Sequence, residues 1–182
     1  MNANISSLIH DYARSWHLLQ AYDENALLSQ TAKQESMHAI SLDQALESIE
    51  QLKEILIEKG EASELFGQLR GNGLESALAT IEQGFGGESF YPNVASRAAH
   101  LLYFIIKNHP LADGNKRSGA FLFLLYLHLN AHLLARPVHE LINDNTLVTV
   151  ALLVAQSDPA QKDLIVNLVQ NLIVLKANSD HA

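Results

Sequence analysis

Hydrophobic positions recur at intervals of three and four residues along nearly the whole chain, the period of a helix with one buried face. The first such row predicts a long helix with a buried stripe made of Ile5, Leu8, Ile9, Tyr12, Ala13, Trp16 and Leu19. The pattern continues over residues 45–56, 74–81 and 94–105. Residues 119–134 are apolar almost all round, which is typical of a helix at the centre of a bundle.

Polar residues mark the points where these helices begin. Ser41 and Gln44 have the spacing of a capping box, in which two side chains satisfy free backbone amides. Asn93 is a suitable N-cap for the helix that follows it. Asp144 opens a later helix, and Asp158, followed by a proline at the first helical position, opens the last one.

One short segment departs from the helical period. Residues 84–87 are rich in glycine and residues 88–91 favour a strand, so a small β-hairpin is expected there. The fold class is therefore all-α, a single compact helical bundle with a small hairpin. We expect residues 1–40 to be an N-terminal helical extension packed on the core, residues 41–176 to be the core domain, and residues 177–182 to be a frayed tail.

Composition narrows the class of protein further. The 182 residues are 48% hydrophobic, contain no cysteine and carry a net charge of −8. The acidic balance argues against a nucleic-acid partner, and the absence of cysteine excludes disulfides and thiolate chemistry. The longest apolar stretch, residues 120–127, is far too short for a membrane span, and the start lacks the blocks of a secretory signal. We expect a soluble cytoplasmic protein without a membrane partner.

The residues that carry chemistry lie between the helix ending near residue 108 and the apolar helix after it. The sequence 109–117 reads His-Pro-Leu-Ala-Asp-Gly-Asn-Lys-Arg. Gly114 permits backbone angles that point successive amides the same way, which together with a helix N-terminus makes an anion site. Arg117 can bind phosphate oxygens, Asp113 can hold Mg²⁺ beside them, and His109 can accept a proton near neutral pH.

These residue types also have plainer interpretations. Residues 109–117 could be an inert turn with a capping Asp113 and a surface His109, but apolar residues on both sides indicate a junction within the core. His128 and His132 are one helical turn apart, with His139 nearby, and lack the pattern of a metal-binding helix. We interpret these three as core or boundary histidines.

The loop resembles the signature of the Fic and Doc (Fido) proteins, His-x-Phe-x-Asp/Glu-Gly-Asn-Gly/Lys-Arg between two central helices. The resemblance covers roughly residues 40–175 and implies a Fic-like bundle with its core domain at residues 41–176. It also implies that the expected hairpin is a flap on which target proteins dock. The flap residues are Gly86, Gly87, Glu88, Ser89, Phe90 and Tyr91.

The resemblance assigns roles to the residues that match the motif. His109 is implied to be the general base that deprotonates a Ser, Thr or Tyr hydroxyl on a target protein, with ATP as co-substrate. Asp113 is implied to coordinate Mg²⁺. Gly114, Asn115 and Lys116 are implied to form the anion nest, and Arg117 is implied to bind the nucleotide phosphates.

Three departures from the family signature bear on the reaction type. Leu111 stands where the motif has Phe, Lys116 where members that transfer AMP have Gly, and Ala120 where those members carry a second arginine. The last two favour Doc-like phosphoryl transfer. Adenylylation by the same site remains the alternative, and a non-catalytic domain that binds nucleotide or a partner protein is the second alternative.

Regulation has one candidate residue. Some Fic proteins are inhibited by a Glu inserted into the nest, and the only upstream match to that pattern is Thr31 to Glu35. The next residue is Ser36 instead of the usual Gly or Asn, and a polar connection between helices explains the segment as well. Alternatively, the protein depends on an antitoxin-like partner or is unregulated.

Overall fold

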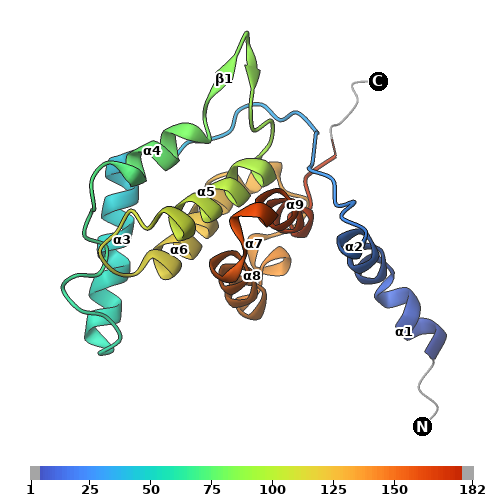
Figure 1. The fold of residues 1–182 in the computed structure, drawn as a ribbon, viewed down its shortest axis with the longest axis horizontal. Coiled ribbons are helices and arrows are strands. Elements are labelled where there is room, and N and C mark those ends of the chain that lie inside the picture. The colour runs from blue at the N-terminus through green and yellow to red at the C-terminus, as the bar shows by residue number, and fades with distance from the viewer. Residues whose placement is uncertain (1–4, 178–182) are drawn as a thin grey trace.

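Two adjacent helices, α5 (Val94–Asn108) and α6 (Asn115–Leu129), form the centre of the fold (Figure 1). They are seen in a computed structural model that describes residues 5–177. α5 and α6 pack against each other more extensively than any other pair of elements in that part of the chain. Their facing side chains make the core, with Leu101, Leu102, Ile105, Leu122 and Phe123 wholly inaccessible to solvent.

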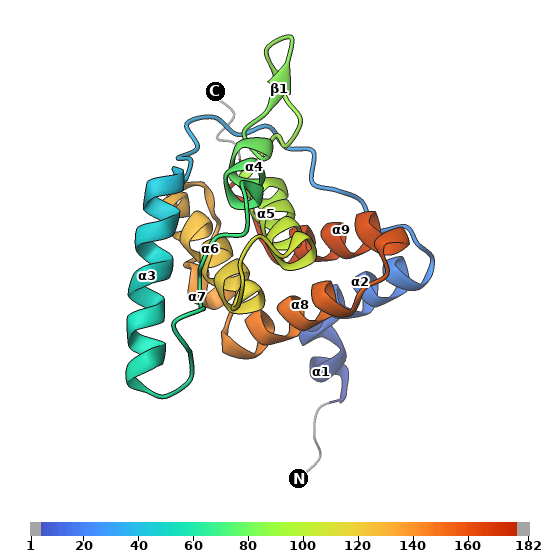
Figure 2. The same ribbon diagram turned by 60° about the vertical axis from the view of Figure 1, so that its left-hand side comes forward.

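The remaining helices cover this central pair. Three of them pack on α5, namely α4 (Gly73–Thr80), α8 (Asp144–Gln156) and α9 (Lys162–Leu172). α3 (Leu42–Glu58) packs on α6 (Figure 2). Short elements join them, namely α7 (Val138–Leu141) and the 3₁₀ turns η1 (Ala131–Leu133) and η2 (Pro159–Gln161). The all-α class is confirmed. Across residues 5–177, every helix is too short or too polar to cross a membrane.

The helix starts follow the predicted caps. The Ser41 hydroxyl and the Gln44 side chain form a complete capping box at α3. Asn93 caps α5 through a hydrogen bond from the Ser96 amide to its side-chain oxygen. Asp158 caps the 3₁₀ turn η2, which leads directly into α9. These ends are set by residues within one turn, which is why the sequence predicts them well.

The expected hairpin is present. β1 (Gly84–Phe85) pairs antiparallel with β2 (Glu88–Ser89), and Gly86 and Gly87 form the turn with φ of 62° and 83°. Both turn residues need the left-handed region, as a two-residue hairpin turn does. The hairpin projects from the bundle next to the beginning of α5 (Figures 1 and 2).

A buried arginine fastens the hairpin to the bundle. Arg97 on α5 is 7% exposed; it forms an ion pair with Glu82 and donates to the Tyr91 carbonyl at 2.9 Å and to the Ser89 hydroxyl at 3.2 Å. The Tyr126 hydroxyl donates to the other oxygen of Glu82 at 3.2 Å. Burial, reinforced by the Glu82 charge, raises the pKa of Tyr126, so its hydroxyl keeps the proton that this bond uses.

The N-terminal region differs from the prediction. The single long helix is instead two, α1 (Ile5–Asp11) and α2 (Ala13–Asp23), which separate at Tyr12. The predicted buried stripe is exposed, with exposed fractions between 50% and 68% for Ile5, Leu8, Ile9, Tyr12, Trp16 and Leu19. The period identified the apolar face correctly, but it carried no information on whether another element covers that face.

Residues 25–41 form an extended strap that connects α2 to α3 across the bundle. Three buried carboxamides hold its backbone. Asn93 donates to the carbonyls of residues 30 and 32, Asn130 bonds both the amide and the carbonyl of His38, and Gln170 accepts from the amide of residue 30. Because these side chains are at most 1% exposed, the strap is part of the core structure and not a loose connection.

Loss of the buried ion pair between Arg97 and Glu82 should destabilise the protein more than loss of the exposed ion pair between Lys33 and Glu88. Arg97→Ala leaves the Glu82 carboxylate, which also accepts from the Tyr126 hydroxyl, without its buried cation and should lower the free energy of unfolding by on the order of 3–5 kcal/mol. Lys33→Ala removes a pair with Glu88 that is about 70% exposed on both sides, and should leave the urea midpoint almost unchanged. Equal midpoints for the two variants would contradict a structural role for Arg97.

Candidate active site

The loop between α5 and α6 turns at two left-handed residues. His109 ends α5 with φ 48° and ψ 57°, and Gly114 precedes α6 with φ 83° and ψ 20°. The left-handed region is uncommon for a residue with a side chain, and such residues gather at functional sites. The histidine and the glycine therefore stand at the two ends of one tight six-residue connection.

Asn115 fixes the shape of this connection. Its side-chain oxygen accepts from the Leu111 amide at 2.9 Å, and its side-chain nitrogen donates to the Leu111 carbonyl at 2.9 Å. The Leu111 side chain is fully buried, so the loop is anchored by backbone and side chain at the same residue. This confirms that Leu fills the core position where the family motif has Phe.

A second segment, residues 66–70, lines the loop from the outside. The Gly67 amide donates to the Asp113 carbonyl at 3.1 Å, the Ala112 amide to the Gln68 carbonyl at 2.8 Å, and the Arg70 amide to the Pro110 carbonyl at 2.7 Å. Sequence reasoning missed this segment, because main-chain pairing between distant residues leaves no hydrophobic period. The only signal was glycine at positions 67, 71 and 73 in and just after the segment, which indicates turns but does not identify what the segment pairs with.

The Phe66 side chain packs against the loop at Gly114. It is 1% exposed, and a Cβ built on Gly114 would overlap its ring. The Arg117 guanidinium lies 4.7 Å from the centre of the same ring. One buried aromatic side chain thus enforces glycine at the turn and lies within cation–π distance of the arginine next to it.

The first turn of α6 offers free backbone amides. Gly114 is the N-cap and no side chain caps this end, so none of the hydrogen bonds within residues 5–177 reaches the amides of Asn115, Lys116 and Arg117. These amides carry the positive end of a fifteen-residue helix. Lys116 and Arg117 are both exposed on the same turn. The turn can therefore bind an anion such as phosphate.

Asp113 and Arg117 stand side by side at this end. The Arg117 guanidinium is 3.8 Å from the Asp113 carboxylate, and its other nitrogen donates to the Glu61 carbonyl at 2.7 Å. Both side chains are close to half exposed, so they remain accessible to a ligand. No cluster of three or more potential metal-binding side chains occurs between residues 5 and 177. A cation here would therefore need oxygen ligands from the bound molecule as well.

Comparison with known proteins places this loop in a family. A model described as the Fic/DOC family matches residues 40–127, the segment from the start of α3 through the loop into α6. This segment belongs to the Fic/DOC family. The toxin Doc of Mycolicibacterium smegmatis is 37% identical over 62 residues, which cover 34% of this chain and 48% of the toxin. The matched region thus spans about half the length of that relative, and no solved structure matches the chain significantly.

The predicted docking flap is separated from the Fic/DOC loop. The hairpin lies before the start of α5 and the loop follows its end, and fifteen helical residues span about 22 Å. The structure therefore brings residues 109–117 together but does not bring residues 86–91 to them. The segment that lies against the loop is residues 66–70.

Glu35 is also remote from the Fic/DOC loop. It is exposed on the strap, and its neighbour Gln34 bonds Pro92 and Val94 at the beginning of α5. Residues 31–35 are not helical. The carboxamides that fix the strap hold Glu35 at the hairpin end of α5, so the structure does not bring it to the first turn of α6.

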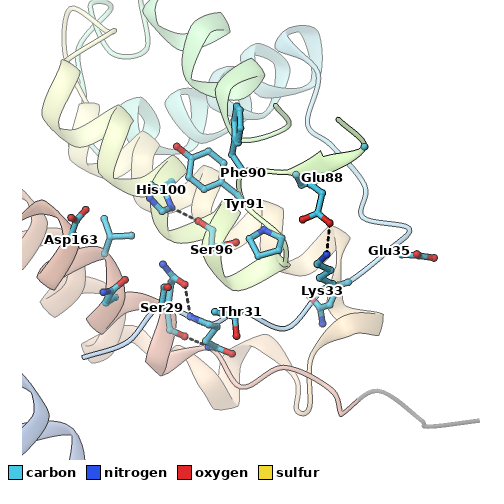
Figure 3. A pocket seen from close by; sticks show the side chains of 18 residues that line it. Ser29, Thr31, Lys33, Glu35, Glu88, Phe90, Tyr91, Ser96, His100 and Asp163 are labelled. Carbon is cyan, nitrogen blue, oxygen red and sulfur yellow. Dashed lines mark hydrogen bonds and ion pairs between the residues drawn. The ribbon is translucent and has the colours of Figure 1, made fainter. Parts of the chain in front are cut away.

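A cavity of about 700 Å³ lies at this same end, between the strap, the hairpin, α5 and α9 (Figure 3). The His100 ring packs 4.2 Å from the Tyr91 ring, and its Nδ1 is 2.7 Å from the Ser96 carbonyl. Burial lowers the pKa of His100, so the ring is neutral near pH 7 and Nδ1 is the donor in that bond. None of the residues that line the cavity belongs to the Fic/DOC loop.

The three candidate metal histidines are on the surface. His128, His132 and His139 are all exposed, and the ring of His132 packs 5.5 Å from the ring of His38. Our expectation of core or boundary positions was therefore wrong. His128 faces outward because the apolar helix α6 keeps a solvent-facing strip near its C-terminal end.

The contact between Gly114 and Phe66 can be tested with a matched glycine. Gly60 has a similar φ of 71° but nothing within 4 Å of an added Cβ, so Gly60→Ala should lower the free energy of unfolding only by the left-handed strain, about 1–2 kcal/mol. Gly114→Ala must also displace the Phe66 ring and should cost about 2–5 kcal/mol. Urea unfolding of both variants measures the difference, and similar losses would show that Phe66 does not enforce the turn.

Proposed function

We propose that this chain is a Mg²⁺-dependent transferase that moves a phosphate-containing group from ATP to a hydroxyl side chain of a target protein. The observation that carries the proposal is the uncapped first turn of α6. Its free amides stand beside Asp113 and Arg117, and His109 lies at the other end of the same anchored loop. Family membership of residues 40–127 supports this class of chemistry.

In the proposed reaction His109 is the general base. It takes the proton from the incoming Ser, Thr or Tyr hydroxyl as the hydroxyl oxygen attacks a phosphorus atom of ATP. The bond from that phosphorus to the bridging oxygen breaks, and the oxygen leaves with the bonding electrons. ADP leaves in phosphoryl transfer, and pyrophosphate leaves in AMP transfer.

The anion nest and Arg117 bind the phosphates. In the structure Arg117 donates to the Glu61 carbonyl and lies near the Asp113 carboxylate, but its side chain keeps 43% exposure. Because the guanidinium lies over the Phe66 ring and remains accessible, a phosphate at the first turn of α6 can replace these partners.

The donor set fits Mg²⁺ held jointly with phosphates. Asp113 supplies one carboxylate that is 47% exposed, and Mg²⁺ is commonly bound by one or two carboxylates together with substrate phosphates. Asp113 is the residue that would hold the ion, and when bound the ion neutralises phosphate charge.

Two positions favour phosphoryl transfer over AMP transfer. Lys116 adds an exposed charge to the nest where a glycine would leave room for a further phosphate. Ala120 is 8% exposed and packed in the core, so the second turn of α6 presents no basic group to anchor the last phosphate of a nucleotide. A nucleotide that presents its γ-phosphate to the hydroxyl is the better fit.

A non-catalytic domain that only binds nucleotide or a partner protein is the second candidate. It would be favoured if the departures at Leu111 and Ala120 marked a decayed site. Leu111 is fully buried and bonded to Asn115 on both backbone groups, so the first of these departures leaves the loop intact. The enzyme is therefore the better supported proposal.

The positions of the hairpin and of Glu35 relative to the loop bear on where a target protein docks and on how the activity is inhibited. We assign target contacts to the exposed Leu65 and Leu69, which flank the loop, in preference to residues 86–91. Since Glu35 is held away from the nest, we assign control to a separate antitoxin-like protein. The similarity to a protein named toxin Doc supports this assignment.

The proposed activity predicts the mass added to a target. Incubation of the purified protein with ATP, Mg²⁺ and a cell extract should yield a modified protein heavier by about 80 Da for a phosphoryl group, against about 329 Da for AMP. His109→Ala should lower the labelling by about 100- to 10,000-fold, the usual effect of removing a general base.

Mass spectrometry of the labelled protein distinguishes the candidates. An adduct of AMP mass would overturn the preference for phosphoryl transfer, and conversion by Lys116→Gly would show that this side chain selects the reaction. Labelling by the wild type equal to that by His109→Ala would support the non-catalytic domain.

The phosphate role of Arg117 predicts a change in nucleotide affinity. Arg117→Ala removes a charged hydrogen-bond donor and should weaken ATP binding by about 1.5–3 kcal/mol in a calorimetric titration with Mg²⁺. Arg136 is also an exposed arginine but lies in the connection between η1 and α7, so Arg136→Ala is the matched control and should bind as the wild type does. Unchanged ATP affinity in Arg117→Ala would refute the assignment.

A further inference from the structure

The outward face of α1 and α2 is an apolar row without a partner among the described residues. Ile5, Leu8, Tyr12, Trp16 and Leu19 are each at least 50% exposed, and Ile9 lies beside them. Scattered exposed apolar side chains are ordinary, but six in one contiguous row along two short helices form a patch of the kind that marks an interaction surface.

The opposite face of α2 is the one that contacts the bundle. The Arg14 guanidinium donates to the Asn171 carbonyl on α9, and Leu18 and Ala21 are partly buried on the same side. A small rotation of α2 would therefore not bury the row. It faces away from the bundle while α2 is held in place by its other side.

Apart from Ile9, whose counterpart on the other side is Ser15, the apolar residues of the row are spaced symmetrically about Tyr12. Residues 5, 8, 12, 16 and 19 are separated by three, four, four and three positions. If a second copy of the chain runs antiparallel with the two-fold axis at Tyr12, Ile5 meets Leu19 of that copy and Leu8 meets its Trp16. A self-complementary surface of this kind is what an isologous dimer interface requires.

Charge also favours a second copy over a lipid surface. The row contains no Lys or Arg, and the residues that flank it are Asp11, Ser15 and Gln20. Helices that bind anionic membranes carry basic residues on the flanks of the apolar face, and this one does not.

The size of the row matches a modest dimer. Six large side chains at half exposure or more present on the order of 600 Å² per copy, so an antiparallel pair would bury about 1,200 Å² in total, the lower end for specific interfaces. We propose that this protein forms a two-fold homodimer through the outward face of α1 and α2, with the axis at Tyr12.

The proposed interface is independent of the proposed transferase site. α2 contacts α9, whereas the Fic/DOC loop pairs with the segment that follows α3, and Figure 1 shows α1 and α2 on the opposite side of the bundle from α3. Dimerisation therefore leaves the loop of each copy open. Failure of one proposal does not affect the other.

Concentration-dependent mass is the first test. Sedimentation velocity should show the wild type passing from one to two copies as concentration rises, and emission from Trp16, the only tryptophan, should shift to shorter wavelength over the same range. Leu8→Glu and Leu19→Glu should each remain monomeric. Val148→Glu, on a 58% exposed residue of α8, is the matched control and should dimerise as the wild type does.

The second test determines the relative orientation of the two copies by disulfide cross-linking. Because the chain has no cysteine, every cross-link must come from the introduced residues. Under an added mild oxidant, Tyr12→Cys should cross-link to itself, whereas Ile5→Cys should cross-link in a mixture with Leu19→Cys and not alone. Self-linking of both Ile5→Cys and Leu19→Cys would show a parallel pair and overturn the antiparallel arrangement with its axis at Tyr12. A wild type that stays monomeric, or variants Leu8→Glu and Leu19→Glu that dimerise like Val148→Glu, would overturn the proposal altogether. Circular dichroism of each variant checks that the helices are retained.

Discussion

The close contact between α5 and α6 is the constraint from which the rest of the structure follows. At Gly119 the two helices approach so closely that an added Cβ would lie 3.1 Å from Ile106 and 3.2 Å from Ile105. This contact is one turn beyond the loop, so it sets how far apart the end of α5 and the start of α6 can be. A six-residue connection over that short gap must turn sharply at both ends, and it does so at His109 and Gly114.

The local parts of the fold could be predicted from the sequence. The caps at Ser41 and Asn93 depend on residues three positions apart, and the loop at residues 109–117 carries its chemistry in consecutive residues. The apolar residues on both sides of the loop indicated a junction within the core, and Leu111 is fully buried there. In each case the interaction that decides the structure lies within one turn of chain.

The parts that could not be predicted depend on distant partners. The contact of Phe66 with Gly114 and the pairing of residues 66–70 with the loop involve groups forty or more positions apart and leave no period. The exposed face of α1 and α2, by contrast, has a clear hydrophobic period. Such a period identifies an apolar face without telling what covers it. The hairpin was placed correctly along the chain, while its distance from the loop depends on the length of α5.

The buried carboxamides under the strap change how the boundary near residue 40 should be understood. Sequence alone suggests an N-terminal extension at residues 1–40 that packs on a core domain beginning at residue 41. A protein shortened to begin at Ser41 would keep Asn93, Asn130 and Gln170 in the interior and lose the backbone groups they bind. The Asn93 side-chain nitrogen, the Asn130 side-chain oxygen and the Gln170 side-chain oxygen would each be left without a partner, while Asn93 keeps its bond to Ser96 and Asn130 its bond to Tyr126. Each buried atom without a partner costs about 1–3 kcal/mol, so three together approach the whole stability of a typical domain. The smallest independently folding unit therefore begins upstream of the segment that the family shares.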